Sequence, residues 1–300
     1  MPKIRANGLE MEYQSLGDEK DETVLLIMGL GAQMTRWPKA LNDKLIAAGF
    51  RVVSFDNRDV GLSEKLEAAG PPDMGAILQA LRDGKKPPAA YTLDEMAADA
   101  VGVLDGLGIA RAHIVGASMG GMIAQLVAAD YPDRVLSLTS IMSTTGNPEL
   151  PRATPQALAV LNDRGPDPAK DFDGFLAHSI KGSRVVGSPA YPADEAELRD
   201  NAAAAFHRCY YPLGFARQYA AVMASPDRRP RLRKITAPTV VVHGEADPLV
   251  PLAGGRDTAR NIPGAELEVI AGMGHDIPAA LHDRIVAAIV RAAERSRVRA

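Results

Sequence analysis

The stretch AHIVGASMGG, residues 112–121, places one serine between glycines where a strand pattern ends and a helix pattern begins. The apolar run before the glycines is typical of a buried strand, and MIAQLVAA after them has helical spacing. A residue at such a tight turn is held in a strained backbone, and small flanking residues are needed to keep strand and helix apart. Gly116 and Gly120 meet that need, so Gly-x-Ser-x-Gly predicts that Ser118 is a nucleophile.

Strand patterns alternate with helix patterns along most of the chain. Short runs rich in β-branched residues predict six buried strands, at residues 23–28, 51–56, 113–116, 135–142, 239–244 and 266–272. The segments between them, such as TRWPKALNDKLIAAG, have apolar residues three and four positions apart and end in Gly or Pro. This alternation predicts an α/β protein with a mostly parallel sheet flanked by helices.

The middle of the chain breaks this alternation. Residues 143–234 contain no convincing strand, several helical pieces interrupted by prolines, and eight of the 13 Phe and Tyr residues. We therefore predict an α/β core, residues 1–142 and 235–300, with an inserted helical cap at residues 143–234. Some of the rings are expected to face a pocket, and others to hold the cap helices together. A helix and a Pro-rich loop between Ser63 and Tyr91 either flank the pocket entrance or decorate the surface.

Composition excludes several classes of function. The formal net charge is −3, so no overall basic field favours nucleic acid or an anionic membrane as a partner. The single cysteine, Cys209, excludes an internal disulfide and a Cys-rich metal site. The N-terminus lacks the apolar region of a secretory signal, and the longest apolar run is too short for a membrane span. We expect a cytoplasmic protein without a membrane span, and its oligomeric state stays open.

A serine hydroxyl needs a base, and the chain has six histidines. His275 lies in GMGHD, a glycine-rich loop after the last predicted strand, from which an imidazole can reach the carboxyl end of the sheet. His113 and His243 lie in predicted strands, and His178 and His207 lie in the cap. His282 lies in the final helix, where it should face solvent. We therefore choose His275 as the base.

The acid that orients this base should follow the preceding strand. VVHGEADPLVP offers Glu245 and Asp247 there. We favour Asp247 because it lies further past the strand end and precedes Pro248, which restricts the loop. Its role would be to accept the Nδ1–H hydrogen bond of His275 and to stabilise the imidazolium.

The oxyanion formed during acyl transfer needs two main-chain donors. One should be the N–H of Met119, the residue after the nucleophile. The other should come from LLIMGLGAQ, where Gly29 and Gly31 allow the backbone to turn, and we choose the N–H of Leu30.

The chain resembles α/β-hydrolase-fold serine esterases over nearly its whole length. The matching segments are LLIMGLG, DNRDVGLS, HIVGASMGGMIAQ, YPDRV, VVHGEADPLVP and GMGHDIP, which begin at residues 25, 56, 113, 131, 241 and 272. The IMG form of the first segment most resembles the aclacinomycin methylesterase branch and related microbial carboxylesterases. This resemblance implies hydrolysis of a small-molecule ester without a cofactor or metal. It also implies a triad of Ser118, Asp247 and His275, with Leu30 and Met119 as oxyanion donors.

The substrate class is open within limits. Serine at the turn excludes epoxide hydrolases and haloalkane dehalogenases, which need a carboxylate nucleophile. We expect a small or medium, mostly apolar ester. Lactonases, thioesterases, perhydrolases and carbon–carbon bond hydrolases share the triad, and a small-ligand-binding protein on this fold is a further alternative. Asp56 and Arg58, in DNRDVGLS, are expected to have a structural ion-pairing role beneath the site.

Overall fold

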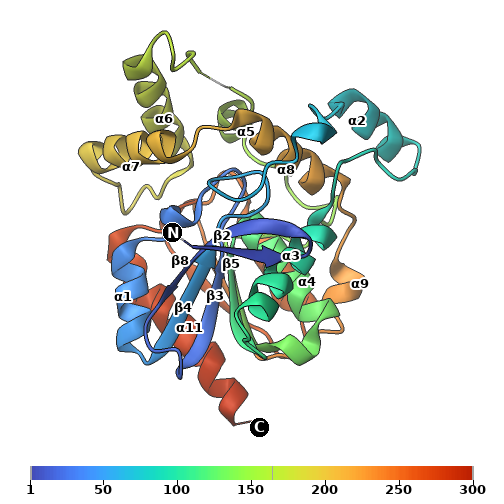
Figure 1. Cartoon of the computed structure of the whole chain (residues 1–300), viewed down its shortest axis with the longest axis vertical. Helices are drawn as coiled ribbons and strands as arrows, with labels where there is room; N and C mark the ends of the chain where they lie inside the picture. The colour runs from blue at the N-terminus through green and yellow to red at the C-terminus, as the bar shows by residue number, and fades with distance from the viewer. Residues whose placement is uncertain (1, 164, 299–300) are drawn as a thin grey trace.

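The computed structural model describes residues 2–163 and 165–298, which form a sheet with helices on both faces (Figure 1). Its eight strands, all in the described residues, have the order β1-β2-β4-β3-β5-β6-β7-β8, and only β1 and β2 pair antiparallel with their neighbours. The strands are β1 Lys3–Ala6, β2 Leu9–Leu16, β3 Glu22–Ile27, β4 Phe50–Phe55, β5 Ala112–Ala117, β6 Val135–Ile141, β7 Thr239–Gly244 and β8 Glu266–Ile270. The predicted mostly parallel sheet is confirmed, and the six predicted strands correspond to β3 to β8.

The sequence reasoning missed the hairpin formed by β1 and β2. Ala6 pairs with Leu9, so only Asn7 and Gly8 form the loop, and both have positive φ, 48° and 84°. Asn-Gly favours this two-residue turn because both residues tolerate the left-handed region. The dipeptide was therefore the signal that could have revealed the hairpin.

The described helices surround the sheet. The α-helices are α1 Lys39–Ala47, α2 Met74–Arg82, α3 Leu93–Gly106, α4 Met119–Asp130, α5 Pro155–Asn162, α6 Phe172–Val186, α7 Glu195–Arg208, α8 Pro212–Ala224, α9 Arg229–Leu232, α10 Leu252–Asn261 and α11 His282–Arg297. The short 3₁₀ turns are η1 Met34–Arg36, η2 Glu67–Ala69, η3 Pro132–Arg134 and η4 Ala279–Leu281. None of the helices in this part of the chain combines the length and the apolar character that crossing a membrane requires.

The two faces of the sheet bury separate cores because strand side chains alternate. In β3, Val24 and Leu26 join the cluster that contains residues of α1 and α11. Leu25 and Ile27 join the other cluster, with residues of α3 and α4. All four side chains are fully buried, which explains why this strand is a continuous apolar run rather than an alternating one.

Four helices between β6 and β7 lie above the carboxyl ends of the strands (Figure 1). We call α5 to α8 and the loops between them, residues 155–224, the helical insert. Within it α6 packs on α5 and α7, while α8 packs on α2. The following α9 contacts α4 and α10 and so belongs with the helices of the core. The boundaries 143 and 234 of the cap stay a prediction.

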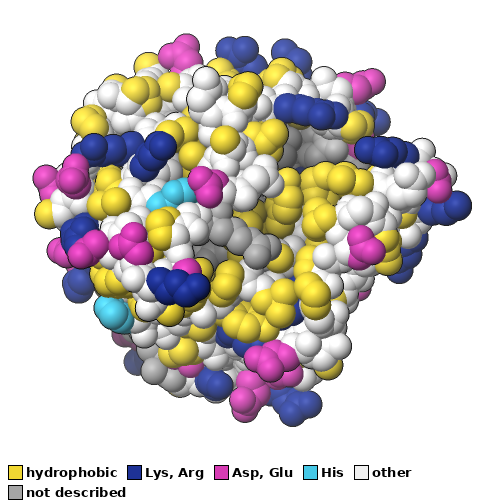
Figure 2. All heavy atoms as spheres, turned by 90° about the horizontal axis from the view of Figure 1, so that it is seen from above, with side chains coloured by type: hydrophobic (Ala, Val, Ile, Leu, Met, Phe, Trp, Pro, Cys, Tyr) yellow, Lys and Arg dark blue, Asp and Glu magenta, His cyan; other side chains and the backbone are white. Residues whose placement is uncertain are grey.

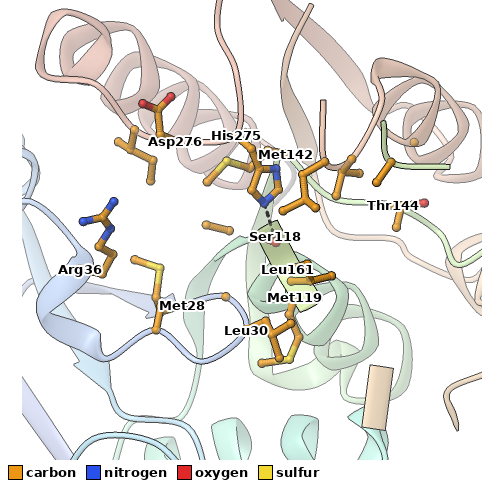
Figure 3. A pocket seen from close by; sticks show the side chains of 18 of the residues that line it. Met28, Leu30, Arg36, Ser118, Met119, Met142, Thr144, Leu161, His275 and Asp276 are labelled. Carbon is orange, nitrogen blue, oxygen red and sulfur yellow. Dashed lines mark hydrogen bonds between the residues drawn. The ribbon is translucent and has the colours of Figure 1, made fainter. Parts of the chain in front are cut away.

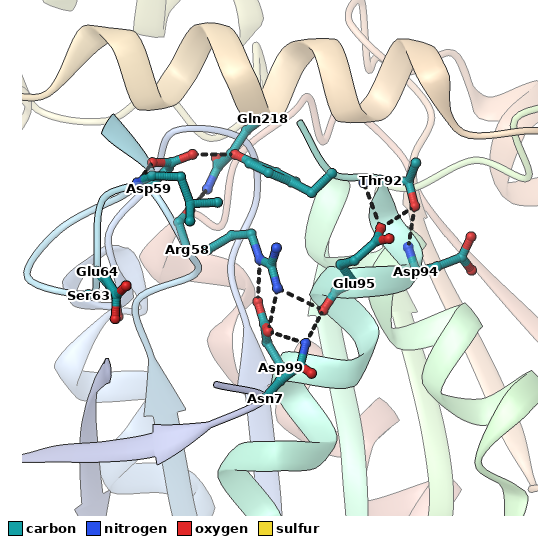
Figure 4. Close-up of polar contacts among 12 residues, drawn as sticks. Asn7, Arg58, Asp59, Ser63, Glu64, Thr92, Asp94, Glu95, Asp99 and Gln218 are labelled. Carbon is teal, nitrogen blue, oxygen red and sulfur yellow. Dashed lines mark hydrogen bonds and ion pairs between the residues drawn. The ribbon is translucent and has the colours of Figure 1, made fainter. Parts of the chain in front are cut away.

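Asp56 and Arg58 are buried and ion-paired, but with different partners. Arg58 pairs with Asp99 of α3 at 2.6 Å, and Asp99 also accepts a hydrogen bond of 2.9 Å from Asn7 (Figure 4). The Asp56 carboxylate lies 2.7 Å from the Arg208 guanidinium, at the end of α7. These two pairs join the loop after β4 to the core on one side and to the helical insert on the other.

Candidate active site

Ser118 lies at the sharp turn between β5 and α4. Its φ is 57° and its ψ is −121°, a strained conformation for a residue with a side chain. A Cβ added to Gly116 would collide with the carbonyl of Gly120, and one added to Gly120 would collide with that of Ile27. The two glycines therefore let β5, β3 and α4 meet closely enough to present the Ser118 side chain at the end of the sheet.

Three residues from three loops meet in a chain of hydrogen bonds (Figure 3 shows the Ser118–His275 pair). His275 Nε2 lies 2.9 Å from Ser118 Oγ, and His275 Nδ1 lies 2.7 Å from Asp247 Oδ2. The Asp247 side chain is fully buried, and that of His275 is 9% exposed. Because β5, β7 and β8 run parallel, the loops after them gather these residues at one edge of the sheet.

The loop after β7 is shaped around Asp247. Asp247 Oδ1 accepts hydrogen bonds from the N–H groups of Leu249 and Val250, at 2.9 and 2.8 Å, which leaves Oδ2 for His275. Glu245, the alternative acid, is exposed to solvent. The structure thus brings Asp247 rather than Glu245 to the imidazole.

The loop after β3 passes directly beside the serine. A Cβ added to Gly29 would lie 3.1 Å from the Ser118 Cβ, tighter than an ordinary contact. Leu30 follows Gly29 in this loop, and its main-chain N–H has no hydrogen-bond acceptor among the described residues. Met119 is the first residue of α4, where N–H groups lack partners within the helix. Two main-chain N–H groups of the predicted kind therefore lie beside Ser118.

Gln218, on α8 of the helical insert, is hydrogen-bonded to the loop after β3. Its side-chain Oε1 accepts from the Gly31 N–H at 2.8 Å, and its Nε2 donates to the Arg58 carbonyl at 2.8 Å. The sequence reasoning missed Gln218. The available signal was the polar pair Arg217-Gln218 within an otherwise apolar helical stripe, and both side chains are buried.

The other histidines have different surroundings. His113 and His243 are fully buried in strands, and burial lowers the pKa of each imidazole, which keeps it neutral. In the helical insert, His178 and His207 are absent from the described lining of the cavity beside Ser118. The expectation that His282 faces solvent is wrong. It begins α11, is 4% exposed and lines the cavity, and burial lowers its pKa as well.

A large cavity opens beside Ser118, and hydrophobic side chains gather around the hollow when the molecule is viewed from above (Figure 2). Its volume is about 1480 Å³. The core supplies Met28, Leu30, Met119 and Met142, and the helical insert supplies Leu161 and Leu198, among others. Two of the eight aromatic residues between 143 and 234, Tyr191 and Tyr219, line it. Leu78 of α2 also lines the wall, so the segment between Ser63 and Tyr91 flanks the cavity.

Comparison with known proteins identifies the family. A family model described as the alpha/beta hydrolase fold matches residues 22–278. The chain belongs to the α/β-hydrolase family. It is therefore a hydrolase, and the fold class and the resemblance inferred from the motifs are confirmed.

Similar proteins have names that refer to several kinds of substrate. The chain is 30% identical to rhodomycin D methylesterase DnrP of Streptomyces peucetius, over 92% of both chains. It is 29% identical to the putative carbamate hydrolase RutD of Caulobacter vibrioides, over 90% of this chain and 89% of that one. A meta-cleavage product hydrolase from Pseudomonas fluorescens has the same fold, with a TM-score of 0.76 at 19% identity over 99% of this chain and 98% of that one.

Proposed function

We propose that this α/β-hydrolase is a carboxylic ester hydrolase with Ser118, His275 and Asp247 as its triad. The observation that carries the proposal is the continuous contact from Ser118 Oγ through His275 to Asp247, at 2.9 and 2.7 Å. Similarity to a methylesterase over nearly the whole chain supports an ester as the substrate.

In this mechanism Ser118 donates its hydroxyl proton to His275 Nε2 as Oγ attacks the ester carbonyl carbon. Asp247 accepts a hydrogen bond from the Nδ1–H of His275 and stabilises the imidazolium that forms. The imidazolium then donates its proton to the leaving alcohol as the carbon–oxygen bond breaks, which leaves an acyl group on Oγ. A water molecule repeats the sequence, releases the carboxylic acid and restores the serine hydroxyl.

The main-chain N–H groups of Leu30 and Met119 would stabilise the tetrahedral oxyanion. Their place beside Ser118, the missing acceptor of the Leu30 N–H among the described residues, and the helix N-terminus at Met119 support this role. Removing one such donor costs roughly 100- to 1000-fold in kcat in other hydrolases.

Gln218→Met tests the support of this oxyanion loop. The variant keeps side-chain length but removes the acceptor of the Gly31 N–H, so we expect kcat for ester hydrolysis to fall about tenfold, less than loss of a donor itself. Gln79→Met is the matched control, because the Gln79 side chain on α2 bonds, within the described part of the chain, only to Asp83 just after that helix. An unchanged kcat in a folded Gln218→Met protein would contradict the role of Gln218.

We also propose that residues 143–234 form a cap over the site and that the substrate is of medium size and mostly apolar. Helices α5 and α7 supply walls of the cavity above Ser118. The volume of about 1480 Å³ exceeds the roughly 300–1000 Å³ of pockets that hold drug-sized ligands. Methionine and leucine side chains around the serine favour burial of an apolar acyl or alcohol group.

A series of p-nitrophenyl esters tests this substrate class. Each buried methylene contributes about 0.8 kcal/mol, so we expect kcat/KM to rise up to about fourfold per methylene from acetate to hexanoate. A maximum at acetate would contradict an extended apolar subsite. Thioesters, lactones, carbon–carbon substrates and peroxide in the same panel separate ester hydrolysis from the other chemistries of the triad, and a clear preference for one of them would overturn the proposal.

A further inference from the structure

The segment that follows α6 contacts the loop that carries His275. The His275 N–H donates to the carbonyl of Val186, the last residue of α6, at 2.7 Å. The neighbouring Gly274 N–H donates to Ser188 Oγ at 2.8 Å, and the Ser188 hydroxyl donates to the Asp276 carboxylate. Both residues that flank His275 are therefore bonded to one serine side chain of the helical insert.

The two segments also approach backbone to backbone. The Ala190 N–H donates to the Gly272 carbonyl at 3.2 Å. A Cβ added to Gly272, whose φ is 67°, would collide with the Ala190 side chain, and one added to Gly274 would collide with the Gly187 carbonyl. The position of the loop after β8 is consequently set by the helical insert as well as by the sheet.

Ser188 is buried between the helical insert and the loop after β8. Its side chain is 3% exposed, and the described lining of the cavity does not include it. Removing the hydroxyl would leave the buried Gly274 N–H without an acceptor and would free the Asp276 carboxylate. The main chain on both sides of His275 would lose its shared anchor, and Asp276 would be the one residue of the cavity wall to lose a Ser188 hydrogen bond.

We propose that Ser188 is a positioning residue for His275. Its hydroxyl fixes residues 274 and 276, and thereby the imidazole, at hydrogen-bond distance from Ser118 Oγ. This inference rests on the proposed function, in which His275 is the base. The helical insert then shapes more than the substrate cavity, because it also determines where the proton acceptor lies.

Ser188→Ala tests the proposal in the full-length protein. A displacement of about 1 Å can cost roughly 100-fold in rate, so we expect kcat to fall about 10- to 100-fold, with KM nearly unchanged. Ser179→Ala is the matched control, because Ser179 lies on the adjacent α6 and, among the described residues, its hydroxyl bonds only to the carbonyl of Phe175 in the same helix. That variant should keep the kcat of the unmodified protein.

A second readout separates positioning from general destabilisation. The proton between His275 Nδ1 and Asp247 should give a far-downfield ¹H NMR signal. We expect this signal to broaden or shift in Ser188→Ala and to stay unchanged in Ser179→Ala. An unchanged kcat, or a lower kcat with an unchanged signal, would overturn the role of Ser188.

Two further variants keep the test decisive. If Ser188→Ala does not fold, Asp276→Asn weakens the same anchor, because it removes the charge of the carboxylate that accepts the hydrogen bond of the Ser188 hydroxyl. An unaltered NMR signal and an unaltered kcat in that variant would overturn the proposal.

Ser118→Ala distinguishes the proposed function from the role of Ser188. Full activity of Ser118→Ala would refute the proposed function, whereas an inactive Ser118→Ala beside a fully active Ser188→Ala would refute only the role of Ser188.

Discussion

Ser118→Ala should lower kcat for ester hydrolysis by at least about 10⁴-fold, as loss of the nucleophile does in other serine hydrolases. The side chain loses only the atom that attacks the carbonyl and donates its proton to His275. Alanine carries the same Cβ at φ 57°, so the backbone strain and the fold should not change. Steady-state hydrolysis of p-nitrophenyl esters measures the effect, and rates near those of the unmodified protein would contradict the nucleophile assignment.

A fluorophosphonate provides the complementary measurement. We expect stoichiometric labelling of the unmodified protein at Ser118, confirmed by peptide mass spectrometry, and none of Ser118→Ala. Ser118→Gly is an informative second variant, because glycine relieves the positive φ and should stabilise the fold by about 1 kcal/mol while abolishing activity. Slow or partial labelling of the unmodified protein would instead favour a small-ligand-binding protein with an inactive triad.

Arg217→Met should reduce the free energy of unfolding by about 3 kcal/mol. Arg217, on α8, donates to both oxygens of the Asp59 carboxylate, at 2.6 and 2.8 Å, and both side chains are almost completely buried. The hydrogen bonds to Asp59 raise the pKa of Arg217, so the guanidinium stays charged. Removing one partner of a buried pair costs about 3–5 kcal/mol because the other charge is left unpaired. We expect the lower end, since Tyr91 and the Leu66 N–H still donate to Asp59.

Urea unfolding measures this loss, and the double variant Arg217→Met/Asp59→Asn is its matched control. With the isolated charge also removed, the double variant should be more stable than Arg217→Met alone. A loss below about 1 kcal/mol for the single variant would show that Asp59 gains solvent or another partner. Because this pair joins α8 to the loop after β4, the measurement also reports how firmly the helical insert is attached.

Much of the fold could be predicted because its signals are local. The apolar runs of β3 to β8 are buried on both faces of the sheet, and such runs are recognisable without knowledge of their neighbours. The turn at Ser118 is local in part: Gly116 is required by its contact with Gly120, whereas Gly120 is required by its contact with Ile27 of β3. The hairpin of β1 and β2 was missed although its Asn7-Gly8 turn was visible.

Other features depended on contacts between residues far apart in the chain. His282 lies on a helix and was expected to face solvent, but its packing beside the cavity buries it. Gln218 acts on a loop 187 residues away in the chain, and Ser188 contacts Asp276 across 88 residues. Polar side chains of this kind resemble ordinary surface residues until the elements around them are assembled.

The sequence alone determined the parallel α/β arrangement, the strained serine turn and the loops that follow each strand, because each depends on side-chain size, glycine conformational freedom and hydrophobic spacing over a few residues. Only the tertiary structure decided that His275 lies 2.9 Å from Ser118 and that Asp247, not Glu245, contacts it. It alone revealed the hydrogen bonds of Gln218 and Ser188 to the loops after β3 and β8. Such distances result from the packing of whole helices and strands, in which each contact between residues far apart in the chain depends on all the others.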